Sequence, residues 1–252
     1  ADLGINPEHV LTFNLAPSDR RFPEVKNIVP YYRQVLERIE SVPGVKSAAF
    51  STGLPTQGTG FGMTFKVVGG PSEEDYGCAF GLITADYLKT LGIRITKGRG
   101  FDQRDTESSV RVAMINEKLA QTVFPGVDPI GQRLTVGEII PPGQLGPPIE
   151  WQVVGVFHNV RNDGLRNDVP EIEVPFWQMP WNRVTAVVRT EVEPTTVTRS
   201  IASAINSFDP ELPLAGVTTL DDVVSEQFAP DRVALALFGG FALAALLLAP
   251  IG

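Results

Sequence analysis

The strongest constraint on the fold is a pattern of strand, helix and strand that occurs twice, once near each end of the chain. In the first copy, apolar residues alternate with polar or small ones over residues 11–15, the period of two that gives a strand one buried face. Apolar residues then recur at helical spacing over 30–42, until Pro43 and Gly44 end the helix. A second strand is predicted over 45–52.

The second copy lies near the other end of the chain. A strand is predicted over 184–190, and Pro194 suits the first turn of a helix. The apolar face of this helix continues to Phe208, where Asp209 and Pro210 end it. A strand is predicted again over 214–220.

Each copy carries a single apolar face and cannot bury that face alone. We therefore predict that residues 10–53 and 183–220 pair as the two halves of a split β-α-β sandwich of the ferredoxin-like kind. The chain is assigned to the α+β class. Residues 1–63 and 171–231 form one discontinuous lobe, and 64–170 form a second, smaller α+β lobe inserted into it.

The inserted segment has its own pattern of predicted elements. Thr84 is predicted to cap a short helix that ends at Gly92, and Asn116 to cap a helix that ends at Pro125. The segment 141–148 is rich in Pro and Gly and is predicted to hold no regular structure. The predicted strands are 64–68, 78–83, 111–115, 132–136 and 151–157.

The C-terminal end is apolar on every side. Residues 233–249 contain no charged side chain, and as a helix they would rise about 25 Å, against about 30 Å for a bilayer core. A helix without a polar face favours the membrane over the surface of a soluble domain. We therefore predict that 232–252 begin a transmembrane helix. A terminal helix buried in a soluble core is the alternative.

Composition and motif spacing exclude several classes of function. The net charge is −8 and no run of Lys or Arg occurs, so nucleic acid is not expected as a partner. His9 and His158 are the only histidines and lack the spacing of metal ligands. Neither a phosphate-binding loop nor a nucleophile elbow occurs. We predict no catalytic site, no cofactor and no metal, and Cys78 is expected to be a core residue.

Two further groups of residues are candidates for sites. The segment 175–181 holds three aromatic residues and one methionine beside two prolines, too many for one face of a strand. Because such residues are enriched at interfaces, they are candidates for partner contact, with packing between lobes as the alternative. The candidates are Phe176, Trp177, Met179 and Trp181. Carboxylates at 73–75 and 102–107 lack the layout of a calcium loop and are interpreted as solvated turns.

Several sequence motifs, taken in order, resemble one family. They are the Pro43-Gly44-Val45 turn, 87–101, 116–124, Asp128-Pro-Ile-Gly131, Val153-Val-Gly-Val156 and Val160-Arg-Asn-Asp-Gly164. The chain resembles the periplasmic core domain of MacB-like ABC-transporter permeases, a group related to FtsX and to the lipoprotein-releasing permeases. The resemblance implies a domain between the first and second transmembrane helices, with one lobe like the porter modules of efflux pumps and another lobe inserted into it.

The resemblance also implies the function and the location. The expected function is that of a non-catalytic domain that couples ATP hydrolysis in the cytosol to export, or to mechanical work on substrates or partners. The domain would lie in the periplasm or extracellular space, attached to the bacterial inner membrane through the C-terminal helix. Implied partners are a cytosolic ABC ATPase subunit or domain, a second permease in a homodimer or pair, and a periplasmic adaptor.

An alternative function is a ligand-sensing or solute-binding ectodomain, with a small molecule in the cleft between the lobes. A pocket with convergent polar groups would favour this alternative. A groove continuous with a partner chain would favour the permease. A soluble enzyme would need a polar constellation that the sequence lacks.

Overall fold

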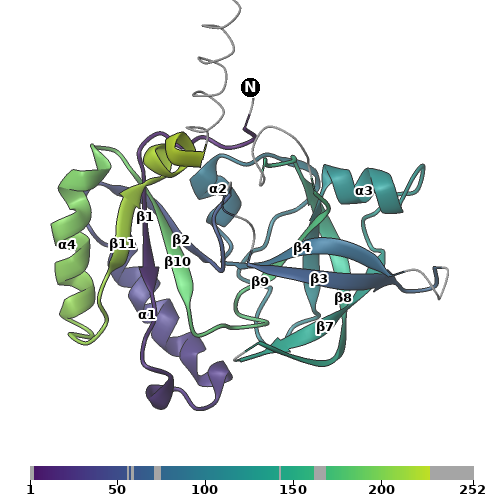
Figure 1. The fold of residues 1–252 in the computed structure, drawn as a ribbon, viewed down its shortest axis with the longest axis horizontal. Helices are drawn as coiled ribbons and strands as arrows, with labels where there is room; N and C mark the ends of the chain where they lie inside the picture. Colours follow the sequence, from purple (N-terminus) through teal and green to yellow (C-terminus); the bar gives the residue numbers. More distant parts are fainter. Residues whose placement is uncertain are drawn as a thin grey trace, which may run out of the picture.

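A computed structural model describes residues 3–55, 57, 60–70, 75–141, 143–161 and 169–227 of the chain. The strands are β1 (Val10–Leu15), β2 (Val45–Ser51), β3 (Phe61–Val67), β4 (Tyr76–Ile83), β5 (Ile95–Gly98), β6 (Val112–Asn116), β7 (Arg133–Ile140), β8 (Gln144–Phe157), β9 (Glu171–Pro175), β10 (Val184–Thr190) and β11 (Ala215–Thr219). The helices are α1 (Val29–Glu40), α2 (Tyr87–Leu91), α3 (Glu117–Val123) and α4 (Pro194–Asn206), with short 3₁₀ helices η1 (Asp19–Arg21) and η2 (Val25–Ile28). Residues 220–227 are also helical (Figure 1).

Four strands in the order β11-β1-β10-β2 form the first lobe, which we call the four-stranded lobe (Figure 1). β1 runs antiparallel to both β10 and β11, and β10 runs antiparallel to β2. Each strand-helix-strand unit therefore contributes two parallel strands, with a strand of the other unit between them. The predicted pairing of segments 10–53 and 183–220 is present.

Helices cover both faces of this sheet because its strands are apolar on both sides. α1 and α4 pack together on one face, where they contact β2 and β1. α2 packs against β2 and β10 on the other face. The alternation along β1 places Leu11 in the core under α1 and Val10 in the core under α2.

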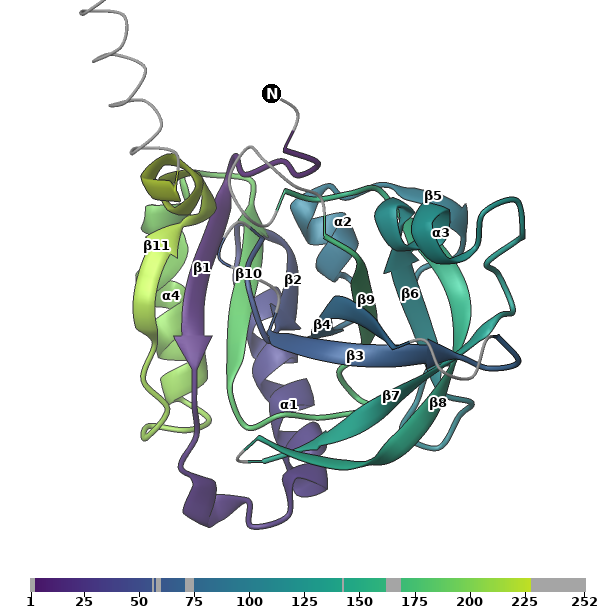
Figure 2. The same cartoon turned by 45° about the vertical axis from the view of Figure 1, so that its right-hand side comes forward.

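Six strands form the second lobe, which we call the ring. Its order is β4-β3-β7-β8-β6-β9, and β9 pairs with β4 to close the circle. β5 pairs with β8 outside this circle. The ring strands are visible on the right of Figure 2. The interior is filled by apolar side chains that include Ala113, Ile115, Leu134, Val136, Trp151, Val153, Ile172 and Val174.

The two lobes share one continuous sheet at a narrow joint. β2 meets β4 through the single residue pair Ser51 and Ile83. The ring extends past the predicted insertion at both ends, since β3 begins at Phe61 and β9 spans 171–175. The joint lies between β2 and β4.

Most predicted elements are present, with differences that have local causes. Asn116 caps α3, as predicted, because its Oδ1 accepts from the Leu119 amide at 2.9 Å. Thr84 does not cap α2. Its hydroxyl accepts from the Phe50 amide at 2.9 Å, and Asp86 is the N-cap residue.

The prediction of no regular structure over 141–148 is wrong, because β8 already begins at Gln144. Pro148 stands opposite Gly137 of β7, and β6 pairs with β8 only from Gln152 onward. This part of β8 is an edge on its second side, where proline is tolerated. Two strands, β5 and β9, were missed.

Within the described residues, no helix is long and apolar enough to cross a membrane. The predicted transmembrane segment 233–249 lies outside those residues.

Candidate functional site

The aromatic segment 175–181 follows β9 and runs between the two lobes. Phe176 is fully buried, and its ring meets that of Tyr32 of α1 edge-on at 5.7 Å between centroids. Met179 is buried in the same core. These two candidates therefore pack the lobes together and present little surface to a partner.

The other two candidates are partly exposed. The guanidinium of Arg33 on α1 lies 4.4 Å from the centre of the Trp177 ring, close enough for a cation-π contact. Arg33 also contacts the loop between β5 and β6, because its Nη2 lies 3.2 Å from a carboxylate oxygen of Glu107. Trp181 meets Phe61 of β3 edge-on at 5.0 Å. Each tryptophan thus lies at the junction of the lobes.

A cleft of about 710 Å³ opens between the lobes beside Trp177. One wall is α1, the floor includes β2 and the turn from β4 to α2, and the far wall is the loop after β5. The lining residues are Arg33, Leu36, Glu37, Glu40, Ala48, Thr84, Ala85, Asp86, Phe101, Asp102, Gln103, Arg104 and Trp177. Side chains from distant parts of the sequence therefore converge on one space.

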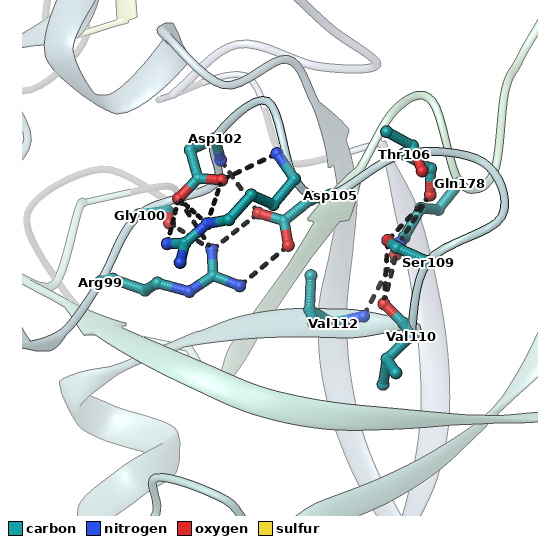
Figure 3. Close-up of polar contacts among 10 residues, drawn as sticks. Arg99, Gly100, Asp102, Asp105, Thr106, Ser109, Val110, Val112 and Gln178 are labelled. Carbon is teal, nitrogen blue, oxygen red and sulfur yellow. Dashed lines mark hydrogen bonds and ion pairs between the residues drawn. The ribbon is translucent and has the colours of Figure 1, made fainter.

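The far wall is a loop fixed by its own ion pairs (Figure 3). Arg99 donates two hydrogen bonds to the buried carboxylate of Asp105, at 2.7 and 2.9 Å. Asp102 accepts from the side chain and backbone of Arg104, and these bonds hold the pKa of Asp102 well below its usual range. The loop is thus a preformed wall. The prediction of a solvated turn is wrong for Asp105, which is buried.

Gln178 clamps the same loop from the aromatic segment. Its side-chain amide donates to the Thr106 and Val110 carbonyls and to the Ser109 hydroxyl, at 2.9–3.1 Å (Figure 3). Its side-chain oxygen accepts from the Val112 amide at 3.1 Å. One buried side chain therefore joins the segment after β9 to the loop that leads into β6.

Negative charge concentrates on the side of the cleft formed by α1. Burial raises the pKa of the Glu40 carboxyl, and the nearby charges of Asp86 and Glu37 raise it further. Lys89 opposes this shift, and it lies 3.6 Å from Asp86. The cleft can therefore hold a positively charged group against the face formed by α1 and the turn before α2.

A second pair of carboxylates lies buried in the ring. Glu171 and Glu173 are two residues apart on β9 and share one face of that strand, opposite Ile172. Burial raises the pKa of Glu173 well above its usual range, and the charge of Glu171 and a hydrogen bond to it add to the shift. A methyl group on Gly81 of β4 would lie 2.2 Å from Glu173 Oε2, so any larger residue there would have to displace this carboxylate.

The residues considered for catalysis or metal binding lie apart. His158 Nδ1 is 2.9 Å from Glu117 Oε2, and His9 Nδ1 is 3.1 Å from the Val192 carbonyl oxygen. Burial raises the pKa of the Cys78 thiol to about 12, which leaves it protonated. Within the described ranges, no three or more His, Cys, Asp or Glu side chains gather in a metal-binding group.

The sequence suggested a cleft between the lobes only as part of the alternative function, without indicating which residues line it, and gave no sign of the contacts of Gln178. Nothing in the sequence links Gln178 to residues 106–112, because that link depends on strand pairing between β6 and β9. The buried position of Asp105 had one local signal, namely the opposite charge of Arg99 six residues earlier. Glu171 and Glu173 alternate with apolar residues, a pattern that predicts an exposed polar face, yet here both faces of the strand are covered.

Comparison with known proteins agrees with this architecture. The family model for the MacB-like periplasmic core domain matches residues 7–206. Macrolide export ATP-binding/permease protein MacB 2 of Aeromonas hydrophila is 33% identical over 91 residues, which are 36% of this chain and 12% of that protein. The chain thus matches a small part of the length of this curated relative.

Two solved structures have a similar fold. The periplasmic region of MacB from Actinobacillus actinomycetemcomitans has a TM-score of 0.56 at 14% identity, over 88% of this chain and 94% of that one. The extracellular domain of the noncanonic ABC-type transporter YknZ from Gram-positive bacteria has a TM-score of 0.51 at 20% identity, over 81% of this chain and 100% of that one.

Proposed function

The chain belongs to the family of MacB-like periplasmic core domains, and from this premise we propose that it couples ATP hydrolysis in the cytosol to export or mechanical work outside the membrane. The domain itself performs no chemistry in this proposal. It moves as a body on the transmembrane helices of a longer permease and transmits that movement to a substrate or partner.

The observation that carries the proposal is the way the lobes are tied together. A joint in which β2 and β4 pair through a single pair of residues would by itself let the two lobes bend relative to each other. Three further ties cross it, namely the packing of Phe176 on Tyr32, the contact of Arg33 with Trp177, and the ion pair of Arg33 with Glu107. Gln178 then fixes the loop that carries Glu107. Force applied to one lobe would pass to the other with little loss.

The wider assembly is part of the same proposal. A cytosolic ABC ATPase subunit or domain would supply the energy, a second permease would complete a dimer or pair, and a periplasmic adaptor would receive the movement. The domain would lie outside the inner membrane, with residues 232–252 beginning a transmembrane helix. We further propose that the four-stranded lobe is of the ferredoxin-like, porter type, and that its border with the inserted lobe lies at the joint of β2 and β4 instead of residues 63 and 171.

Loosening the clamp tests the proposal. In the full-length permease reconstituted in vesicles with its ATPase, Gln178→Ala should lower transport per ATP hydrolysed by several-fold, while hydrolysis continues. Gln121→Ala on the exposed surface of α3 is the matched control and should leave the ratio unchanged. An unchanged ratio in Gln178→Ala, together with hydrogen exchange showing a loosened loop, would refute transmission through this tie.

The cleft favours one other function, that of a sensor or binder of small cationic solutes. Glu37, Glu40, Asp86 and Trp177 are among the residues that line it. Amines such as spermidine can be titrated calorimetrically into the chain and into Glu40→Gln. Saturable binding that this substitution weakens would support the second function, and its absence would leave the permease role as the only one.

A further inference from the structure

The ring has an open seam between β3 and β7. The two strands pair antiparallel over three residue pairs, which are Phe65 with Val136, Lys66 with Thr135 and Val67 with Leu134. A continued register would bring residues 61–64 opposite 137–140. These residues instead pair only with β4 and β8, respectively. The two strands diverge from the closed end in Figure 2.

A local irregularity explains the divergence. The register between β7 and β8 shifts between Gly137 and Ile139, and such a bulge bends and twists the strand that carries it. Gly137 begins the divergence. A methyl group placed on it would lie 3.6 Å from Leu145 Cδ2 and 3.9 Å from Met63 Cε, so the ends of these two side chains come close to Gly137.

The space between the diverging strands is a groove of about 900 Å³. Apolar side chains and glycines dominate its lining, which is Gly60, Phe61, Gly62, Met63, Thr64, Gly77, Cys78, Gly137, Ile139, Gly143, Leu145, Gly146 and Pro148. Leu145 is 71% exposed beside the half-buried Met63. Gly62 and Gly77 have open space above their Cα atoms. The groove is therefore mostly apolar and open at Gly62 and Gly77, and the flexible side chains of Met63 and Leu145 lie within it.

Both long edges of the groove are strand edges. Within the described part of the chain, residues 61–64 and 137–140 each have a partner strand on one side only. Backbone N–H and C=O groups that face the groove are thus available to an additional strand. Four residues of extended chain span about 13 Å, a length that fits the unpaired portions of β3 and β7.

Charge adds a preference for the occupant. The carboxylate of Glu138 lies at the rim, 3.1 Å from the position of a methyl group on Gly146. Glu138 forms no ion pair with any residue that the structure describes. The nearby carboxylates Glu150 and Asp75, by contrast, are paired with Arg133 and Lys66. A basic side chain on the occupant would complement Glu138.

We propose that this groove binds an extended segment of another protein, which inserts between β3 and β7 as an added strand. Its apolar side chains at alternate positions would contact Met63, Ile139 and Leu145, and a Lys or Arg would face Glu138. Backbone hydrogen bonds on both sides provide affinity, and the apolar lining provides selectivity. The inference is independent of the permease role.

An array of heptapeptides tests the groove. Positions 2, 4 and 6 carry Val, Ile, Leu or Glu, and the remaining positions carry Thr, Lys or Glu. The labelled chain should bind peptides that combine apolar alternate positions with lysine. Leu145→Glu should lower this binding at least about ten-fold. Val127→Glu, at another exposed apolar position, is the matched control and should bind as the original chain does.

Two further experiments separate insertion from other modes of contact. N-methylation of either alternate set of backbone amides in the strongest peptide should weaken binding, because an inserted strand uses both sets. Glu138→Lys should reverse the preference from lysine-containing to glutamate-containing peptides.

Several outcomes would overturn the proposal. One is that no peptide binds more tightly than the all-Glu member of the array. Another is that the Leu145→Glu variant binds the peptides as tightly as the original chain does. Sensitivity to only one set of N-methyl groups would indicate addition to a single edge. Self-association in sedimentation velocity that Leu145→Glu abolishes would assign the groove to a second copy of this chain.

Discussion

One buried carboxylate in the four-stranded lobe and one in the ring differ in how they are paired. In the four-stranded lobe, the buried carboxylate of Asp209 accepts hydrogen bonds from Arg21 at 2.5 Å and from the Tyr31 hydroxyl at 2.6 Å, so a charge ties η1 and α1 to the end of α4. In the ring, one oxygen of Glu173 is buried without a hydrogen-bond partner among the described residues. The same holds for Trp151 Nε1.

This difference follows from how each lobe is assembled. Helices pack over both faces of the first sheet, and the end of α4 brings Asp209 to the margin, where it finds partners. Arg38 Nε on α1 has no hydrogen-bond partner among the described residues, but its guanidinium lies 4.8 Å from the centre of the Phe208 ring. A closed ring of strands encloses its interior and covers the second face of β9 as well. Polar groups there cannot reach water, and burial without a partner costs about 1–3 kcal/mol. The ring is therefore expected to respond more strongly to changes in its polar residues.

The largest expected effect is that of truncating Trp151. Its side chain is fully buried in the ring, and Trp151→Ala should lower the free energy of unfolding by about 3–5 kcal/mol. Ile201→Ala in α4 is the counterpart in the four-stranded lobe. Hydrogen exchange should show lost protection in the ring for the first variant and in the helical lobe for the second. Equal loss across both lobes in both variants would mean that they unfold as one unit.

Truncating the Gln178 side chain has the next largest expected effect on stability. Gln178→Ala leaves the Val112 amide without its partner and removes one bond each from the Thr106 and Val110 carbonyls, which keep bonds from Ser109. The substitution should cost about 1–3 kcal/mol in urea unfolding. Gln121→Ala should change stability by less than about 0.5 kcal/mol. If both substitutions have the same small effect, Gln178 contributes no tie between the lobes.

A smaller loss is expected for Asp209→Asn, about 1–2 kcal/mol near neutral pH, because the hydrogen bonds lose their charge. Burial of Asp209 opposes ionisation, but the bonds from Tyr31 and Arg21 prevail and lower its pKa. Its contribution is therefore complete above the unfolded value near 3.8 and is lost as pH falls through the lower folded pKa. Urea midpoints from pH 2 to 7 measure this, with the exposed Asp221→Asn as control. A loss in Asp209→Asn that does not shrink in acid would contradict the assignment.

The smallest expected effect is a gain in stability, whereas the three substitutions above lower it. Glu173→Gln should raise stability at pH 8 by about 1 kcal/mol, because the unfolded glutamate is ionised while the buried one favours its proton. In the unfolded chain, Glu173 loses its proton near pH 4.5, whereas its pKa in the folded chain is raised well above that value. The stability of the original chain therefore declines as pH rises from about 4.5 through the folded pKa. The variant should show a flatter profile in thermal unfolding from pH 4 to 9. Exposed Glu191→Gln is the control, and a profile unchanged by Glu173→Gln would remove the contrast between the lobes.

The sequence by itself determined the class of fold, the two strand-helix-strand units and most element positions. Patterns such as the alternation over 11–15 and the cap at Asn116 arise from neighbours within a few residues, so they can be read locally. The pairing of the two units also followed, because each left one apolar face uncovered. Motif order was enough to indicate the family.

Only the tertiary structure decided the closure of the ring, the residues that line the interlobe cleft, the Gln178 clamp and the open seam at β3 and β7. Each of these depends on which strands become neighbours, and that choice is made by packing between segments far apart in the sequence. β9 shows this most clearly. Its glutamates alternate like the polar face of a surface strand, yet pairing with both β4 and β6 and the second core beneath α2 bury them. Periodicity reveals a strand's two faces, but its surroundings decide whether either one meets water.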